Sequence, residues 1–233
     1  WNFHGFVVSD WGAVNDRVAD LESGMDLEMP SSFGMRDAEI VKAVRCGRLP
    51  ESVLDRAVTR ILRIVQRYLA GRNPDTVFDR DADHALAREI ASQCMVLLKN
   101  ECGVLPLKKG CRVALFGKAQ IDYVRGGGGS GEVTTSYTRN IYEGMKLKEE
   151  EGKLQVFDEL SRFYEEDVKE QYAQGKENGK TVEPAVPAGL LQAARRYTDI
   201  AVITICRFSG EDWDRKGIPG DGDFYLSPQE QEM

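Results

Sequence analysis

The chain has 233 residues, of which 42% are apolar and 9% aromatic, so it can bury a core and is not a disordered protein. Its 38 acidic and 31 basic residues are interspersed and give a net charge of -7, which argues against a nucleic acid or an anionic membrane as the main partner. No window approaches the ~18 apolar residues of a membrane span, and the first ten residues lack the features of a signal peptide.

In residues 5–69 the apolar periodicity predicts alternating strands and helices. In chain order, the expected elements are a buried strand at 5–8, a helix over 14–23 closed by Gly24, a strand over 25–30, and helices over 36–45 and 51–69. Residues 71–80 are polar and contain glycine and proline, so they are interpreted as a linker.

A second alternation of helices and strands follows the linker. In chain order, the expected elements are a helix over 82–98, an extended piece at 104–107, a buried strand at 112–117, helices over 154–172 and 190–197, and a strand at 199–206. The last strand is continuously apolar, as is typical of a parallel sheet covered on both faces. A final helix is expected to begin after Ser227, with Glu230 completing its cap. The predicted fold class is α/β.

Cysteine and histidine offer little chemistry in this chain. The five cysteines are scattered, odd in number and without a CxxC pair, so we predict neither a disulfide framework nor a zinc site and interpret them as buried or incidental thiols. They favour a cytoplasmic location, unless a signal peptide precedes residue 1. His4 and His84 are too few for a histidine metal centre or a Ser-His-Asp triad. We expect no metal and no cofactor, and chemistry based on carboxylates.

The first candidate site is Asp10, which follows the expected strand at 5–8. Barrel enzymes hold catalytic groups at the C-terminal ends of parallel strands, where the strand fixes the group and the loops admit substrate. Trp11 next to it offers an apolar face for a sugar ring. The alternative is that Asp10 caps the following helix and Trp11 belongs to the core.

The second candidate site is the glycine loop, residues 126–131, in which five of six residues are glycine and the sixth is Ser130. Such a loop lets main-chain N–H groups approach a ligand closely. It satisfies GxGxxG, but Glu132 stands where a phosphate loop needs lysine, and residues 133–136 are β-branched and polar where a dinucleotide site needs a helix. The remaining interpretations are a turn without ligand, a sugar-contacting loop or a loop that bridges domains.

The third candidate site is the segment 209–215, which follows the strand expected at 199–206. Open α/β sheets bind ligands beyond the C-terminal ends of their strands, and Glu211 stands at such a place. Arg215 is expected to pair with Asp212 or Asp214. The alternative is a solvated acidic loop. The other acidic run, residues 149–170, is interpreted as a solvated helix face.

Taken together, these segments resemble glycoside hydrolase family 3, the β-glucosidase family, over nearly the whole chain. Residues 5–11 resemble the family's nucleophile segment, 24–30 its last barrel strand, 96–101 with 105–107 the start of its second domain, and 209–211 with 214–215 and 223–227 the region of its acid/base glutamate. Asp212 departs from the family, whose members often have glycine there.

The resemblance implies the C-terminal part of a (β/α)8-like barrel followed by an incomplete α/β/α sandwich. The barrel part is expected over residues 1–70, a linker and connecting helix over 71–99, and the sandwich over 100–233. A complete barrel needs eight βα units and about 250 residues, and only about the last two units are recognised here. We therefore expect a fragment that is poorly active or inactive alone.

The resemblance also implies a retaining, exo-acting β-glycosidase, foremost a β-glucosidase that acts on β-linked glucosides or short oligosaccharides. Asp10 would be the nucleophile and Glu211 the acid/base, while Trp11 and Ser130 would contact the sugar. Glu211 would need a raised pKa, favoured by burial and by the nearby charge of Asp10. The intact protein would be a candidate homo-oligomer. A non-catalytic carbohydrate-binding or structural fragment and a β-xylosidase are the alternatives.

Overall fold

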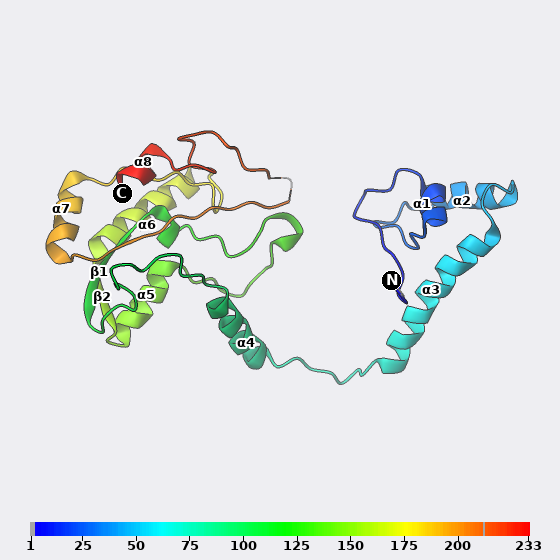
Figure 1. The fold of residues 1–233 in the computed structure, drawn as a ribbon, viewed down its shortest axis with the longest axis horizontal. Helices are drawn as coiled ribbons and strands as arrows, with labels where there is room; N and C mark the ends of the chain where they lie inside the picture. The colour runs from blue at the N-terminus through cyan, green and yellow to red at the C-terminus, as the bar shows by residue number, and fades with distance from the viewer. Residues whose placement is uncertain (1–2, 212) are drawn as a thin grey trace. The chain divides into compact units, whose positions relative to one another are not determined.

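The chain forms two compact units in this computed structural model, which describes residues 3–211 and 213–233 (Figure 1). The first unit extends to Val96, and the second comprises Leu97–Met233. No helix within the described residues is long and apolar enough to cross a membrane.

Three helices form the core of the first unit: α1 (Arg17–Ser23), α2 (Met35–Arg45) and α3 (Glu51–Gly71). Their apolar faces meet in a buried cluster of Val18, Leu21, Ala43, Leu49 and Ala57. The predicted helices are all present, but α1 begins later than expected because the side chain of Asp16 caps it, accepting hydrogen bonds from the amides of Val18 and Ala19. Gly24 ends α1 in the left-handed conformation, with φ 99°.

The two strands expected in the first unit are reduced to a single parallel bridge between Val8 and Leu27. The prediction of a buried strand at 5–8 is wrong, because Val7 and Val8 remain 42% and 43% exposed. A strand in a parallel sheet is buried only when neighbouring strands and covering helices enclose it. Within the described residues, the segment around Leu27 is the one that pairs with it.

Helix α4 (Arg80–Gln93) follows an irregular segment at 72–79. It begins earlier than the predicted 82–98, since the side chain of Asp79 caps it by accepting from the amides of Asp81 and Ala82, and it also ends earlier, at Gln93. None of its residues is buried. Its apolar residues, Leu86 and Ile90 among them, are about half exposed.

A three-stranded parallel sheet organises the second unit, with the strand order β2-β1-β3. The strands are β1 (Cys111–Phe116), β2 (Leu154–Val156) and β3 (Ala201–Ile203). The helices are α5 (Ile141–Glu150), α6 (Asp158–Ala173), α7 (Ala188–Tyr197) and α8 (Pro228–Glu232), with short 3-10 turns at Lys118–Gln120 and Gly129–Gly131. Parallel strands joined by helices make this unit the α/β sandwich that the sequence predicts.

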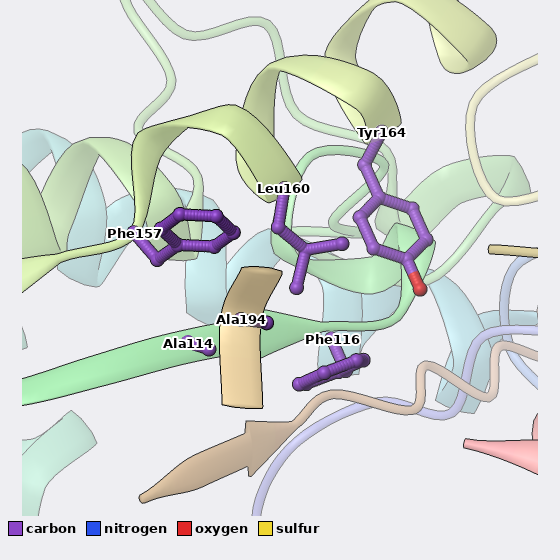
Figure 2. Packing of buried hydrophobic residues seen from close by; sticks show 6 residues of the cluster. All are labelled: Ala114, Phe116, Phe157, Leu160, Tyr164 and Ala194. Carbon is purple, nitrogen blue, oxygen red and sulfur yellow. The ribbon is translucent and has the colours of Figure 1, made fainter. Parts of the chain in front are cut away.

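The alternating side chains of β1 build a core on each face of the sheet. Ala114 and Phe116 face α6 and α7, where Phe157, Leu160 and Tyr164 pack over them with Ala194 (Figure 2). On the other face Val113 and Leu115 form a cluster with residues of β2 and with Tyr142 and Met145 of α5. Helices therefore cover both sides of β1, which fixes the end of this strand and the loop that leaves it.

The predicted helix over 154–172 begins too early. Leu154–Val156 is a strand because it pairs with Cys111–Val113, and α6 starts only at Asp158. The acidic run at 149–170 is therefore divided among the end of α5, β2 and α6 instead of forming one helix face. The expected strand at 199–206 is confirmed over Ala201–Ile203, but it is not covered on both faces, since Ile203 and Ile205 remain about half exposed.

Candidate active site

Asp10 lies where the segment bridged to Leu27 ends. The backbone N–H of Ser9 donates to the carbonyl of Leu27 (2.9 Å), and the Ser9 hydroxyl bonds the main chain of Met29 in both directions. Two residues before Ser9, the amide of Val7 donates to the buried carboxylate of Asp26 (2.8 Å). These contacts hold the backbone on the N-terminal side of Asp10, while its own carboxylate stays exposed.

The alternative assigned to Asp10 and Trp11, a helix cap beside a core tryptophan, is wrong. Asp16 is the residue that caps α1, and Asp10 Oδ1 instead accepts from the amide of Trp11 (2.7 Å). Trp11 is 69% exposed, so its ring is not a core residue. Asp10 and Trp11 thus present an exposed carboxylate next to an exposed indole.

In the second unit the glycine loop lies directly against the segment 208–211. A Cβ built on Gly210 would come within 2.5 Å of the amide nitrogen of Gly128, and a Cβ on Gly129 within 2.4 Å of the Glu211 side chain. Gly129 also has a positive φ of 65°. Glycine is required at both positions because real Cβ atoms do not come this close to other heavy atoms.

This close approach brings together two of the predicted site residues, Ser130 and Glu211, which lie 81 positions apart. Oε2 of Glu211 accepts a hydrogen bond from the Ser130 backbone N–H (2.8 Å) and another from the Ser130 hydroxyl (3.0 Å). Both bonds stabilise the ionised carboxylate, so they hold the pKa of Glu211 below its ordinary value. The expectation of a raised pKa is therefore not met in this chain, where Glu211 is exposed instead of buried.

A buried carboxylate, Asp122, anchors the start of the glycine loop. Asp122 is fully buried, and five donors surround its carboxylate. One oxygen accepts from Tyr172 Oη (2.6 Å), Asn178 Nδ2 (2.6 Å) and the Gly179 amide (2.8 Å). The other accepts from the Thr181 hydroxyl and from Lys118 Nζ (3.4 Å). Burial acts to raise the pKa of Asp122, but these hydrogen bonds and the Lys118 charge outweigh it and lower the pKa. Asp122 thus ties residues 172–181 to the chain that leads into the loop.

Two ion pairs hold the segments before and after Glu211. Arg215 Nη1 contacts the carboxylate of Asp223 (3.1 Å). The expected pairing of Arg215 with Asp214 is therefore wrong. Asp212, the other expected partner, lies outside the described residues. Arg207 forms a bidentate pair with Glu230 (2.7 and 2.6 Å). Glu230 is also the N3 residue of the capping box that Ser227 begins at α8, as predicted.

The glycine loop does not have the structure of a nucleotide site. It forms the 3-10 turn Gly129–Gly131, and the next helix, α5, starts only at Ile141 behind a capping box of Asn140 and Glu143. A phosphate site on a GxGxxG loop needs a helix N-terminus next to the loop.

A hollow of about 300 Å³, at the lower end of the range for ligand pockets, is lined by Val124–Gly127 and Arg207–Ser209.

Among the residues that the structure describes, no group of three His, Cys, Asp or Glu side chains is placed to bind a metal ion. All five cysteines are free thiols. Three of them, Cys46, Cys94 and Cys102, are exposed, so the interpretation of buried thiols does not hold for these.

Asp122 and Asp26 are the structural residues that sequence reasoning missed. Neither belongs to a local pattern. The partners of Asp122 range from Lys118, four residues earlier, to Thr181, 59 residues later. Asp26 accepts from the amide of Val7, 19 residues earlier. The one local signal in the sequence is that each stands between two apolar or aromatic residues, Asp26 between Met25 and Leu27 and Asp122 between Ile121 and Tyr123.

Residues 95–232 match the family described as the glycosyl hydrolase family 3 C-terminal domain. The chain belongs to glycosyl hydrolase family 3. It is 49% identical over 146 residues to thermostable beta-glucosidase B of Acetivibrio thermocellus and 44% identical over 183 residues to beta-glucosidase A of Butyrivibrio fibrisolvens. These matches cover 63% and 70% of this chain.

The structure of beta-glucosidase 3B from Thermotoga neapolitana in complex with glycerol matches with a TM-score of 0.87 at 35% identity. This match covers 100% of the family 3 chain described here and 33% of the Thermotoga chain. The chain spans about a fifth of the length of the two curated relatives, at 19% and 22%. The relatives are glycosidases, and the resemblance seen in the sequence motifs is confirmed.

Proposed function

We propose that the protein carrying this chain is a retaining, exo-acting β-glycosidase that releases terminal β-D-glucosyl residues from β-linked glucosides and short oligosaccharides. The support for glucosides is the naming of the similar proteins as beta-glucosidases. The support for chemistry in this chain is the held carboxylate of Glu211 in one unit and the exposed carboxylate of Asp10 in the other.

In this proposal Asp10 is the nucleophile. Its carboxylate attacks the anomeric carbon and forms a covalent glycosyl ester while the bond to the leaving oxygen breaks. The backbone contacts of Ser9 and the Val7 amide would hold it in place, and the exposed face of Trp11 would pack against the apolar side of the sugar ring.

Glu211 is the proposed acid/base. In the first step it gives its proton to the leaving oxygen, and in the second it takes a proton from the water that attacks the glycosyl ester, so the proton count is restored after each turnover. Retention requires the two carboxyl groups about 5 to 5.5 Å apart in the working enzyme. Substrate bound over Glu211 would remove water from its carboxylate and raise its pKa above the value it has in this exposed setting.

The deciding experiment is trapping of the intact protein with a 2-deoxy-2-fluoro β-glucoside, followed by peptide mass spectrometry. The fluorine slows hydrolysis of the glycosyl ester, so a retaining enzyme is caught as its intermediate. We expect the label on Asp10, in the tryptic peptide that ends at Arg17, and fragmentation separates it from Asp16 in the same peptide. D10N should abolish labelling, whereas D16N, which alters only the cap of α1, should keep it.

The role of Glu211 is tested by E211A on an activated aryl glucoside with and without azide. Azide needs no base to attack the glycosyl ester, so rescue of turnover by azide indicates loss of the acid/base. E132A is the matched control, because Glu132 is an exposed glutamate that follows the same glycine loop. If the 2-deoxy-2-fluoro β-xyloside labels the protein and the β-glucoside does not, the proposal changes to a β-xylosidase. No labelling of folded protein would favour a carbohydrate-binding role.

A further inference from the structure

The two hydrogen bonds from Ser130 to Glu211 end on the same oxygen. The backbone N–H and the hydroxyl both donate to Oε2, at 2.8 and 3.0 Å. Within the described residues, no hydrogen bond reaches Oε1. Among the described residues the carboxylate is therefore asymmetric: Oε2 accepts from two donors, and Oε1 accepts from none.

The main-chain part of this contact is fixed by the backbone around it. Gly129 has positive φ and leaves room for the Glu211 side chain, and Gly210 leaves room for the Gly128 backbone. Because Gly210 meets the Gly128 backbone directly, the Ser130 amide is presented to the carboxylate without depending on a flexible side chain. The Ser130 hydroxyl adds a second donor from the same residue.

Several described charged residues on the neighbouring segments have other partners or carry the same sign as Glu211. Arg125 donates to the carbonyl of Val133, Arg207 pairs with Glu230, and Lys180 lies over the Trp213 ring at 4.2 Å. Glu132 and Asp214 are acidic and exposed. Ser130 is thus the residue whose donors the structure gives to the Glu211 carboxylate.

We propose that Ser130 is a positioning residue for the acid/base: by holding Oε2, it makes Oε1 the oxygen that carries and delivers the catalytic proton. A protonated carboxyl with its hydrogen on Oε1 can keep both Ser130 bonds, because Oε2 is then the carbonyl oxygen and still accepts. In the glycosylation step the Oε1–H bond breaks, the proton passes to the leaving oxygen, and Glu211 becomes the anion that the same two donors stabilise.

This inference rests on the proposed function, and it gives Ser130 a role apart from touching the sugar. A serine that only binds sugar lowers the barrier equally for good and poor leaving groups. A serine that positions the acid is needed chiefly where the leaving oxygen requires a proton. The two roles therefore separate in the dependence of the rate on leaving group.

The first test needs no turnover and uses the 233-residue chain. The Glu211 carboxyl is titrated by 13C NMR in the parent chain, S130A and S130T. We expect S130A to raise the pKa of Glu211, because the anion loses one donor, and S130T to restore the parent value, because threonine keeps a hydroxyl. An S130A titration that coincides with the parent would overturn the inference, whatever the protein's activity.

The second test uses the intact protein and two β-glucosides, one with a 2,4-dinitrophenolate leaving group and one with an alkoxide. For S130A we expect kcat/KM to fall about tenfold or more on the alkyl glucoside and less than about threefold on the dinitrophenyl glucoside, within the ~10²–10⁴ range of general acid catalysis. The alkaline limb of the pH profile should move to higher pH, and S130T should recover both.

The results distinguish this inference from the function on which it rests. Equal losses on both substrates would overturn the positioning role and leave sugar contact as the role of Ser130. A Glu211 titration that responds to S130A, in an intact protein that shows no trapping and no glycosidase activity, would refute the proposed function and with it the catalytic meaning of the contact.

Discussion

Removal of the buried Asp122 carboxylate should destabilise the second unit more than removal of any exposed acid. In D122A the buried Lys118 side chain loses the anion 3.4 Å from its ammonium nitrogen, and the donors of Tyr172, Asn178 and Gly179 lose their acceptor. Breaking a buried charge pair from one side costs about 3–5 kcal/mol. Against a total stability of about 5–15 kcal/mol, this is a large part of what keeps such a unit folded.

The assay is native-state hydrogen exchange of the β1 amides, because this strand belongs to the second unit alone and lies at the centre of its sheet. We expect the free energy of opening to fall by about 3–5 kcal/mol in D122A and by about 1–3 kcal/mol in D122N, which keeps one acceptor oxygen. D199A is the matched control: Asp199 is exposed, and its removal should change stability by no more than about 0.5 kcal/mol. A D122A chain within about 1 kcal/mol of the parent would refute the reasoning.

The pH dependence of the same variant checks the electrostatics. The folded-state pKa of Asp122 is lowered relative to an unfolded value of about 3.9, so its contribution is present above that value and is lost as the pH falls through the folded pKa. The parent should therefore lose this part of its stability below about pH 4. D122N should lack it and show a flatter profile in acid.

Three further variants test the remaining contacts. G129A should displace Glu211 and raise its pKa in the NMR titration, because the added Cβ would lie 2.4 Å from the glutamate side chain, whereas G131A, with open space at that position, should leave it unchanged. Burial raises the pKa of Glu183, so its charged form costs stability at pH values above the unfolded pKa. E183Q should therefore be no less stable than the parent at pH 7. Its free energy of opening by hydrogen exchange, relative to that of the parent, should rise from pH 4 to 7. S227A should cost about 1 kcal/mol in urea unfolding through loss of the α8 cap, and an effect below about 0.3 kcal/mol would contradict that role.

Local signals were sufficient to predict the helices with one strongly apolar face. In α3, Leu54, Val58, Ile61 and Val65 recur at helical spacing, and the expected 51–69 agrees with the observed Glu51–Gly71 to within two residues. The cap of α8 was equally local, since Ser227 and Glu230 bond each other's backbone three residues apart. In both cases the chain segment itself contains the interactions that determine its structure.

The strand β2 shows where local signals fail. Leu154, Phe157 and Leu160 are spaced three residues apart, as on one face of a helix, and this spacing predicts a helix that begins at Leu154. Leu154 is nevertheless a strand residue, because its backbone pairs with Cys111, 43 positions earlier. A three-residue strand has too short an alternation to compete with a helical pattern, so only its tertiary partner reveals it.

The site divides in the same way. The resemblance could point to Ser130 and Glu211 separately, but their direct contact depends on Gly129 and Gly210, whose need for space appears only when the two segments meet. For the same reason Arg215 was paired with a sequence neighbour, when its partner is Asp223, eight residues on. Contacts between loops are specified by the scaffold that brings the loops together, and no single segment contains that information.

The two proposed catalytic carboxylates therefore differ in what holds them. Glu211 is held by Ser130 within the second unit, where β1 is packed on both faces and Asp122 ties the chain that precedes the glycine loop to residues 172–181. Asp10 lies in a segment whose pairing in the described residues is one bridge, two further backbone hydrogen bonds and a few side-chain bonds, with Val7 and Val8 partly exposed. The coupling of Ser130 to Glu211 should thus be measurable in the 233-residue chain even if that chain does not turn over substrate. Turnover demands more, since Asp10 must also be fixed to within about 0.5 Å of its productive position.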